Sequence, residues 1–359
     1  MNYDLNEILK HFNIELDVDS YGNGHINDTY LCDCDPKYIL QRINKEIFTN
    51  PPGVMQNISA VTEHLVKKIK AAGGNPQKET LQIVKTVEGE SFYKSADGEY
   101  YRMYVFVDDT VTKETAEKPE DLYQAAKAFG KFQNMLADFP ADTLYETIPD
   151  FHNTKKRIET FKEIVEADKF DRLKYVQEEV DYALSLVDEM GIVVDLLESG
   201  ELPLRVTHND TKLNNVLFDE KTDEAMCVID LDTVMPGSLL YDFGDALRFG
   251  ASSGTEDEKD LSKIYFDLDK YKAFTQGFLE ELSSSITEKE IELLPFSAKL
   301  LTYECGIRFL GDYLNGDVYF RTHYDGHNLD RARTQLKLVW DMTGKMDDMM
   351  SIVKECLNK

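Results

Sequence analysis

The chain contains few cysteines and no long apolar segment. Its five cysteines are an odd number scattered over 359 residues, which argues against a disulfide framework. Cys32 and Cys34 lie close together, but no second Cys/His pair accompanies them, so reduced thiols are favoured over a zinc site. No stretch reaches the roughly 18 unbroken apolar residues of a membrane-spanning helix. The first residues include acids and no long apolar core, unlike those of a signal peptide. We therefore expect a soluble, cytoplasmic protein.

Basic residues are also in short supply. Lys and Arg together number 40 against 67 Asp and Glu, which gives a net charge of -27. Such a field repels nucleic acid and anionic membrane surfaces, so we expect neither as a partner. It would also repel ATP, so a nucleotide enzyme of this composition needs a locally positive site, and bound Mg²⁺ can reverse the local field. The hydrophobic content of 42% is that of a globular protein, and the length predicts two or three structural units.

The first hundred residues are rich in short β-prone runs. Such runs predict strands at residues 29–33, 38–42, 81–86, 91–94 and 100–107. The turn residues 96–99 predict a hairpin between the last two strands. The stretch between Gly53 and Gly73 instead has apolar residues at helical spacing, which predicts a helix. The residues on this stripe are Val54, Ile58, Val61, Leu65 and Ile69.

After Pro119 the pattern becomes mainly helical. It predicts three amphipathic helices and then a β-rich interlude, at residues 122–137, 155–166, 172–190 and 204–232. Thr287 and Glu290 have the spacing of a capping box, which opens a helix predicted to run toward Asn315. The predicted fold class is therefore α+β, with a small β-rich N-terminal part, a linker and a larger, mainly helical part.

The segment with the strongest chemical signal is 208–215, which reads HNDTKLNN. It has the H-x-D-x-x-x-x-N spacing of a kinase catalytic loop. Phosphoryl transfer needs a carboxylate that orients the acceptor hydroxyl and takes its proton, and Asp210 fits this role. Lys212 can offset the charge of the transferring phosphate, and Asn215 can bind Mg²⁺ through its amide oxygen. We expect His208 to be buried and to brace the loop. An accidental polar loop is the alternative for this segment alone.

A second acidic segment follows. Residues 225–232 read AMCVIDLD, an apolar strand that ends in Asp230 and Asp232. Asp230 lies fifteen residues after Asn215, a distance over which a hairpin can bring a second Mg²⁺ ligand beside the first. A turn residue is the alternative for Asp230. Asp232 either shares the metal or stabilises the turn.

Two further acids follow a Pro-Gly-Ser loop. Asp242 and Asp245 lie at the expected start of a helix, where negative charge suits the helix dipole. That role is sufficient for Asp242, whereas Asp245 could also reach a substrate pocket.

Near the N-terminus, YGNGHINDTY joins two predicted strands. Gly22 and Gly24 would let the backbone approach phosphates closely. A plain hairpin turn is the alternative, because a single Gly-x-Gly is a weak signal. His25 and Asn27 could face either the nucleotide or the acceptor.

Together these segments resemble the aminoglycoside phosphotransferase and choline kinase group of small-molecule kinases, over nearly the whole chain. Within that group they resemble bacterial N-acetylhexosamine 1-kinases. The stretches that carry the resemblance are YGNGHINDTYL, YILQRIN, LRVTHNDTKLNN, IDLDTVMPGSLLYDFGDALRFGAS, LLPFSAKLLTYECGIRFLGDYLNGDVYF and HNLDRARTQLKLV. The resemblance implies that ATP and Mg²⁺ phosphorylate the anomeric hydroxyl of N-acetylglucosamine or N-acetylgalactosamine, giving the sugar 1-phosphate and ADP.

The resemblance also implies a bilobal, protein-kinase-like fold. Residues 1–107 would form a nucleotide-binding lobe, 108–118 a linker, and 119–359 a catalytic and substrate-binding lobe. Asp210 would be the base, and Asn215 and Asp230 the metal ligands, as the chemistry alone predicts.

The resemblance assigns three residues to the sugar. Arg308 and Tyr319 match positions expected to hold it, and His25 would lie by the active site. Without the resemblance, Arg308 is a charge inside an apolar helical run, and such a charge is usually paired or functional. Tyr319 alone would be an ordinary core or rim aromatic.

The third predicted strand departs from the usual kinase pattern. Kinases of this fold place a Lys there, which pairs with nucleotide phosphates and with a helix Glu, whereas this chain has Gln41. The adjacent Arg42 would point to the opposite face. Glu63 on the next helix is a weak candidate partner. We therefore expect Gln41 at the nucleotide, with the group that holds the α and β phosphates left open.

Several alternatives remain compatible with the sequence. The same fold could serve a kinase for choline, homoserine, methylthioribose or an aminoglycoside. A pseudokinase is disfavoured because Asp210, Lys212, Asn215 and Asp230 are all present. The sequence leaves open GlcNAc or GalNAc as acceptor, ATP or GTP as donor, and the oligomeric state.

Overall fold

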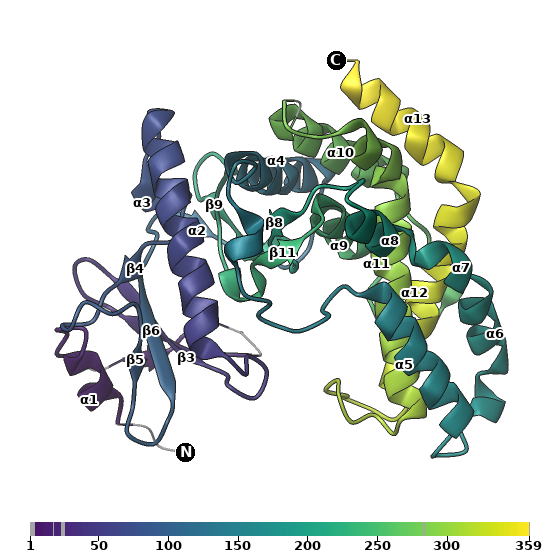
Figure 1. Ribbon diagram of the computed structural model, residues 1–359, viewed down its shortest axis with the longest axis horizontal. Coiled ribbons are helices and arrows are strands. Elements are labelled where there is room, and N and C mark those ends of the chain that lie inside the picture. Colours follow the sequence, from purple (N-terminus) through teal and green to yellow (C-terminus); the bar gives the residue numbers. More distant parts are fainter. Residues whose placement is uncertain (1–3, 17, 23–25, 283, 359) are drawn as a thin grey trace. The chain divides into compact units, whose positions relative to one another are not determined.

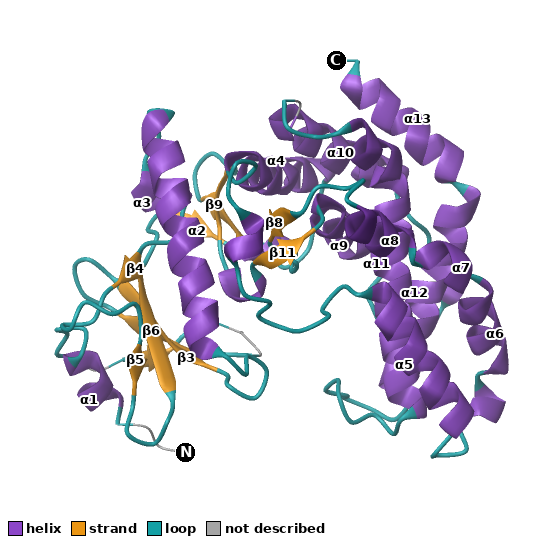
Figure 2. Cartoon of the chain, viewed as in Figure 1, coloured by secondary structure: helices purple, strands orange, loops and turns teal. Residues whose placement is uncertain are grey.

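The chain forms two compact units in a computed structural model, which describes residues 4–16, 18–22, 26–282 and 284–358 (Figure 1). The first unit comprises Met1–Thr112, Met135–Pro149 and Asn215–Pro236, and the second comprises Lys113–Asn134, Asp150–Asn214 and Gly237–Lys359. Strands dominate the N-terminal part and helices the C-terminal part, which confirms the α+β class (Figure 2). The finer division at residues 107 and 119 stays a prediction.

The first unit is built on an antiparallel sheet. Its strands are β1 (Asp19–Ser20), β2 (Asp28–Cys32), β3 (Tyr38–Ile43), β4 (Ile83–Val84), β5 (Tyr93–Lys94) and β6 (Tyr100–Val105). The order is β1-β2-β3-β6-β4, and β5 pairs with β6. Every strand predicted in the first hundred residues overlaps an observed one, although β4 and β5 are shorter than 81–86 and 91–94. Gly98 in the β5–β6 hairpin has a φ of 83°, a left-handed conformation that glycine adopts easily.

The two faces of this sheet differ in character. On one face Leu40 and Met103 pack in an apolar core with helix α1 (Leu5–Lys10). Because neighbouring strand residues point to opposite faces, Gln41 and Arg102 project from the other face. There Arg102 approaches Met55 of α2, at 4.0 Å between Nη1 and Sδ. The second face therefore carries polar groups beneath a helix.

Helix α2 (Pro51–Ala71) confirms the helix predicted between Gly53 and Gly73. It begins after Asn50, whose side chain accepts from the Gly53 N–H, and Pro51 takes a first-turn position that needs no N–H donor. All five residues of the predicted apolar stripe are buried. Figure 1 shows α2 running beside the sheet of the first unit, and the short α3 (Pro76–Glu79) follows it.

The first unit also contains a smaller antiparallel sheet of order β10-β9-β7. Its strands are β7 (Thr110–Val111), β9 (Val216–Asp219) and β10 (Ala225–Val228). The β9–β10 hairpin confirms the predicted pairing of the two segments that carry the metal-ligand candidates. β7 lies within the range expected to be a linker. After β10 come a 3₁₀ turn at Leu231–Thr233 and the short β11 (Met235–Gly237).

The second unit is mainly helical. In chain order it contains α4 (Pro119–Met135), α5 (Thr154–Ala167), α6 (Gln177–Ser185), α7 (Val187–Met190), α8 (Ile192–Ser199), β8 (Arg205–Thr207), α9 (Leu239–Gly250), α10 (Leu268–Leu282), α11 (Glu288–Leu314), α12 (His327–Gly344) and α13 (Met346–Leu357). The long α11 is central and packs against α5, α9 and α12. The capping box of Thr287 and Glu290 at its start is confirmed.

The single helix predicted at 172–190 is wrong. The segment instead forms a 3₁₀ turn at Leu173–Tyr175 and then the separate helices α6 and α7. Val176 has φ -138° and ψ 24°, outside the helical region, and its side chain is fully buried. Burial of this side chain outweighs continuation of the helix, while the apolar spacing that produced the prediction persists across the break.

Two expected absences concern membranes and disulfides. No helix in the described part of the chain has the length and apolar character needed to cross a membrane. No disulfide joins the five cysteines, all of which lie within the described residues, and burial raises the pKa of Cys32 to about 11. The cytoplasmic location stays a prediction.

Candidate active site

The catalytic-loop candidate begins in the second unit, directly after β8. His208 is fully buried, and its ring lies edge-on to Phe129 and Phe132 of α4, with centroids 5.6 and 6.0 Å away. The Asp210 N–H donates to His208 Nδ1 over 3.3 Å. The expectation that His208 is buried and braces the loop is therefore confirmed.

Asp242 of α9 is hydrogen-bonded to the backbone of the same loop. Its carboxylate accepts from the backbone N–H groups of His208 and Asn209 at 2.9 and 2.8 Å. Gln133 of α4 donates to it as well, over 2.6 Å. Asn209 has a left-handed φ of 65°, which a non-glycine residue adopts only when its surroundings enforce it. Asp242 therefore fixes the loop conformation, a role that the helix-dipole interpretation did not foresee.

Asp245, one turn further along α9, is also engaged in the fold. It accepts from the Thr211 N–H over 3.0 Å and pairs with Arg248. Burial opposes its ionisation, but Arg248 and Lys212 hold the pKa of Asp245 below its ordinary value. Its side chain is thus committed to the loop and to a neighbouring cation, which disfavours the substrate role left open by the sequence.

Asp210 and Lys212 lie together. The Lys212 Nζ is 2.7 Å from Asp210 Oδ1, and both side chains are partly exposed. Burial lowers the pKa of Lys212, but Asp210 outweighs this and raises it. Lys212 is therefore a stable cation beside the carboxylate, as a residue that offsets phosphate charge must be.

A cavity of about 300 Å³ lies against this loop within the second unit. Thr211 and Leu213 form one wall, and Leu122, Ala246 and Phe274 contribute apolar surface. Its lining does not include Arg308 or Tyr319, so it does not coincide with the position that the sequence assigns to the sugar.

The two metal-ligand candidates belong to the first unit and are neighbours in its hairpin. Val228 pairs with Val216, and the Ile229 N–H donates to the Asn215 C=O over 2.9 Å. Asp230 follows directly and has a left-handed φ of 60°. The hairpin thus places the backbones of Asn215 and Asp230 next to each other, while their role as metal ligands stays a prediction.

The chemistry of this pair fits Mg²⁺. An amide and a carboxylate supply hard oxygen ligands, and Mg²⁺ is typically held by one or two such groups together with substrate phosphates. The described residues contain no group of three or more His, Cys, Asp and Glu placed to hold a metal. A site completed by the phosphates of a nucleotide is consistent with that observation.

Asp232, two residues further, is occupied by other partners. One carboxylate oxygen is paired with Arg102 of β6, and the other accepts from Asn27 over 2.6 Å. Arg102 and Asp232 are only 1% and 2% exposed. Both oxygens therefore serve the fold, which favours the turn-stabilising alternative for Asp232 over metal binding.

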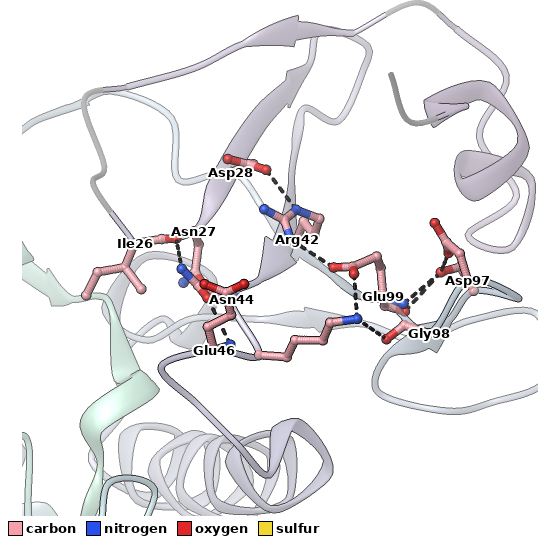
Figure 3. Close-up of polar contacts among 11 residues, drawn as sticks. Ile26, Asn27, Asp28, Arg42, Asn44, Glu46, Asp97, Gly98 and Glu99 are labelled. Atoms are coloured by element: carbon pink, nitrogen blue, oxygen red, sulfur yellow. Dashed lines mark hydrogen bonds and ion pairs between the residues drawn. The ribbon is translucent and has the colours of Figure 1, made fainter. Parts of the chain in front are cut away.

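Gln41 is likewise bound on both sides of its amide. Its Oε1 accepts from Arg102 Nε and Nη2 at 3.0 and 2.8 Å, and its Nε2 donates to Thr29. Arg42 pairs with Asp28 and Glu99 instead, both at 2.8 Å (Figure 3). The role of Gln41 at a nucleotide stays a prediction.

The glycine-rich segment is described only in part. Gly22 has a left-handed φ of 75°, while Gly24 and His25 lie outside the described residues. Asn27, where the segment re-enters the sheet, accepts from the Asn44 N–H over 2.9 Å (Figure 3). Asn27 thus connects the end of this segment to Asn44 and to Asp232.

Arg308 and Tyr319, the residues assigned to the sugar, lie close together in the second unit. The Arg308 guanidinium carbon is 5.8 Å from the Tyr319 ring centroid and 5.3 Å from that of Phe320. Tyr319 is 71% exposed. An exposed aromatic face beside a cation is thus available to a ligand.

The loop that carries Tyr319 is held by Asp312, which the sequence analysis missed. Its carboxylate accepts from the N–H groups of Val318, Tyr319 and Phe320 at 2.9 to 3.0 Å. Asn328 donates to it over 2.9 Å. Three of the four donors on this buried carboxylate belong to the loop, so Asp312 fixes the backbone that carries the exposed ring.

A buried acid also lies one turn before Arg308. Glu304 accepts from His152 Nδ1 and from the Thr154 hydroxyl, both over 2.9 Å. Burial opposes its ionisation, but His152, Arg157 and Arg308 hold the pKa of Glu304 below its ordinary value. Its negative charge therefore partly balances the Arg308 guanidinium.

Comparison with known proteins gives a family match and structural relatives. The profile of the Phosphotransferase enzyme family matches residues 17–274. An aminoglycoside phosphotransferase from Alicyclobacillus acidocaldarius is 13% identical, with a TM-score of 0.63 over 98% of this chain and 96% of that chain. A spectinomycin phosphotransferase in complex with ADP and spectinomycin is 15% identical, with a TM-score of 0.57 over 96% and 97%.

A choline kinase from Cryptosporidium parvum is 14% identical, with a TM-score of 0.55 over 96% of this chain and 93% of that chain. At these identities the structural likeness concerns the fold. It supports the kinase-like α+β architecture predicted from the sequence.

Proposed function

This chain belongs to the Phosphotransferase enzyme family, and on that premise we propose that it phosphorylates the anomeric hydroxyl of N-acetylhexosamines, GlcNAc or GalNAc, using ATP and Mg²⁺. The family match and the kinases of the same fold support a small-molecule kinase with an alcohol acceptor. The sugar acceptor is the finer part of the proposal and depends on the residues below.

In this proposal Asp210 accepts the proton of the acceptor hydroxyl and Lys212 offsets the charge of the transferring phosphoryl group. Their 2.7 Å contact supports a shared role. Asn215 and Asp230 are the metal ligands, supported by their neighbouring places in the β9–β10 hairpin. Mg²⁺ held by Asn215 and Asp230 would supply positive charge that offsets the negative charge of the transferring phosphoryl group.

The nucleotide donor is proposed to bind in the first unit, at Gly22, Gly24 and Gln41. The ADP in the spectinomycin phosphotransferase complex supports a nucleotide donor for this fold. Comparing turnover with ATP and with GTP would show which nucleotide is the donor.

The observation that carries the sugar proposal is the Arg308–Tyr319 pair. An exposed ring can stack on the C–H face of a pyranose, and a guanidinium can donate to hydroxyl or acetamide oxygens. A choline kinase would need an aromatic cage around a quaternary ammonium. Here the rings of Phe151, Tyr319 and Phe320 already lie within 5.3 to 5.9 Å of the Arg308 guanidinium. A second cation would be repelled, so a neutral acceptor is favoured over choline or an aminoglycoside.

A substrate panel tests this proposal. Release of ADP would be measured with GlcNAc, GalNAc, choline, homoserine, methylthioribose and an aminoglycoside, and phosphorus NMR would identify the phosphorylated oxygen. We expect turnover of the N-acetylhexosamines, an anomeric phosphate product, and loss of activity with EDTA that Mg²⁺ restores. Rapid turnover of an aminoglycoside or choline without turnover of GlcNAc would overturn the sugar assignment.

Replacing Tyr319 by Ala sharpens the test. We expect KM for the sugar to rise about tenfold while KM for ATP is unchanged, because one stacking contact of about 1–2 kcal/mol is lost. The matched control is Tyr175→Ala, since Tyr175 is 64% exposed in the same unit and has no assigned role. Equal sugar KM values for the two variants would contradict a role for Tyr319.

A further inference from the structure

The first unit contains a buried polar cluster in which β6 is joined to three other segments that are distant in sequence. Arg102 of β6 donates through Nε and Nη2 to Gln41 of β3, and its Nη1 pairs with Asp232 after β10. Asp232 also accepts from Asn27, at the end of the glycine-rich segment. The cluster therefore connects the glycine-rich segment, the third strand and the metal-ligand turn.

Arg102 lies opposite the position at which kinases of this fold carry a lysine. In the β3–β6 register Gln41 is the direct partner of Arg102, so the two side chains project from the same face of the sheet. The chain thus has a neutral amide at the lysine position and a cation on the neighbouring strand. The positive charge is displaced by one strand, about 5 Å.

The turn at Asp230 needs support from its surroundings. Its left-handed backbone is rare for a non-glycine residue. On one side the Ile229 N–H is bonded to Asn215. On the other side Asp232 is bound by Arg102 and Asn27, and Asn57 of α2 donates to the Val234 C=O over 2.9 Å. The strained residue is therefore anchored on both sides, and Arg102 provides the charged anchor.

Arg102 does not have the exposure needed to contact a ligand itself. It is 1% exposed, and its three nitrogens are engaged by Gln41 and Asp232. The hydroxyl of Tyr104, two residues further on the same face of β6, is buried and has no hydrogen-bond partner among the described residues. Arg102 lies 5.2 Å from the Tyr104 ring centroid. The cluster therefore lies in the interior of the first unit and stabilises it, and the Tyr104 hydroxyl beside it has no hydrogen-bond partner among the described residues.

We propose that Arg102 is a positioning residue for the nucleotide site: its ion pair with Asp232 fixes the Asp230 turn in the conformation that binds the metal–nucleotide complex. This inference rests on the proposed nucleotide function. It predicts that the pair affects binding of a metal–nucleotide complex more than binding of the nucleotide alone, because Arg102 acts on the metal-ligand turn.

The test uses the full chain and isothermal titration calorimetry without acceptor, with AMP-PNP as probe, in the presence of Mg²⁺ and of EDTA. Arg102→Met alone would leave a buried carboxylate without its cation, so the main variant is the pair Arg102→Met and Asp232→Asn. We expect its Kd for Mg²⁺·AMP-PNP to rise at least tenfold and its Kd for metal-free AMP-PNP to change less than threefold. Unchanged binding of the magnesium complex would overturn the proposal, as would equal weakening with and without Mg²⁺.

A conservative variant gives an independent test. Arg102→Lys keeps a cation at the same position of β6, where it can pair with Asp232, and leaves Gln41 unchanged. We expect its Kd for Mg²⁺·AMP-PNP to lie within threefold of the wild-type value. A loss of tenfold or more in this folded variant would overturn the proposal, and this result decides the matter if the first pair does not fold.

The matched control is the pair Arg205→Met and Glu290→Gln. Arg205 forms a buried ion pair with Glu290 in the second unit, at 2.5 Å, so these two substitutions also neutralise a buried ion pair without touching the cluster. We expect a lower thermal midpoint and unchanged Kd for Mg²⁺·AMP-PNP. If the wild-type chain itself binds no Mg²⁺·nucleotide, the proposed function fails, whereas wild-type binding with unaffected Arg102 variants defeats only this inference.

Discussion

Asp242 in the second unit and Asp232 in the first are both buried beside candidate catalytic segments, but they are stabilised differently. Asp242 accepts from two backbone N–H groups and Gln133, whereas Asp232 is paired with the guanidinium of Arg102. The Asp242 carboxylate is surrounded by N–H dipoles, whereas the Asp232 carboxylate faces the full positive charge of Arg102. The comparison indicates that the catalytic loop is held by local backbone geometry, and the metal-ligand turn by a charge from a distant strand.

The largest expected effect comes from replacing the candidate base, Asp210, and not from replacing Asp242 or Asp232. Asp210→Asn should lower kcat by about 10²- to 10⁴-fold, because proton acceptance is lost while the side chain keeps its shape. Binding of nucleotide, measured by calorimetry, should be unchanged. A kcat equal to that of the wild type would show that Asp210 is not the base, and the comparison of loop anchors would then lose its catalytic meaning.

Breaking the buried ion pair of Arg102 and Asp232 should cost the most stability. Asp232→Asn leaves Arg102 buried without a counter-ion, and removing one partner of such a pair costs about 3–5 kcal/mol. Urea unfolding monitored by circular dichroism would measure the loss.

Asp33→Asn is the matched control, because the Asp33 side chain is 73% exposed in the same unit. We expect a change within about 0.5 kcal/mol for it. Similar values for Asp232→Asn and Asp33→Asn would contradict the importance of the buried pair.

Weakening the hydrogen bonds of Asp242 should cost less stability. In Asp242→Asn one oxygen becomes an NH₂ group, so one backbone N–H of the loop loses its acceptor, which costs about 1–3 kcal/mol. The unfolding free energy should therefore fall less than for Asp232→Asn, while kcat should fall because the loop carries Asp210. A larger stability loss for Asp242→Asn than for Asp232→Asn would reverse the comparison.

The smallest effect is a pH dependence at Glu304. Because its folded-state pKa lies below the unfolded value, its ionisation stabilises the fold above the unfolded pKa of about 4.3. That contribution is lost as the pH falls through the folded pKa. The stability gap between wild type and Glu304→Gln, from urea unfolding, should therefore be greatest at pH 7 and should shrink toward pH 3.

Glu198→Gln serves as the control for this experiment, since the Glu198 side chain is 67% exposed. Its stability should follow that of the wild type at every pH. A gap for Glu304→Gln that stays constant with pH would show that ionisation of Glu304 does not contribute.

Some missed residues carried a usable signal in the sequence. Arg308 attracted attention as a charge inside an apolar helical run, and Arg102 has the same property within the strand YYRMYV. Applying the same rule to strands would have identified Arg102 but not its partner. Asp312, four residues after Arg308 in the same run of α11, carries the same signal, but its four donors become neighbours only when the chain turns back after α11.

The sequence by itself determined the strands around one helix in the N-terminal part, the capping box of α11, and the loop spacing that places Asp210 five residues before Asn215. These features depend on periodicity, turn residues and short chain distances, which are local properties. Tertiary structure alone decided that Asp242 holds the loop, that Asp232 pairs with Arg102, and that the segment 172–190 breaks at Val176. The physical reason is that burial and charge compensation depend on contacts between residues far apart in the sequence, such as Arg102 and Asp232, which are 130 positions apart. No local pattern encodes which of the available partners a buried charge will meet.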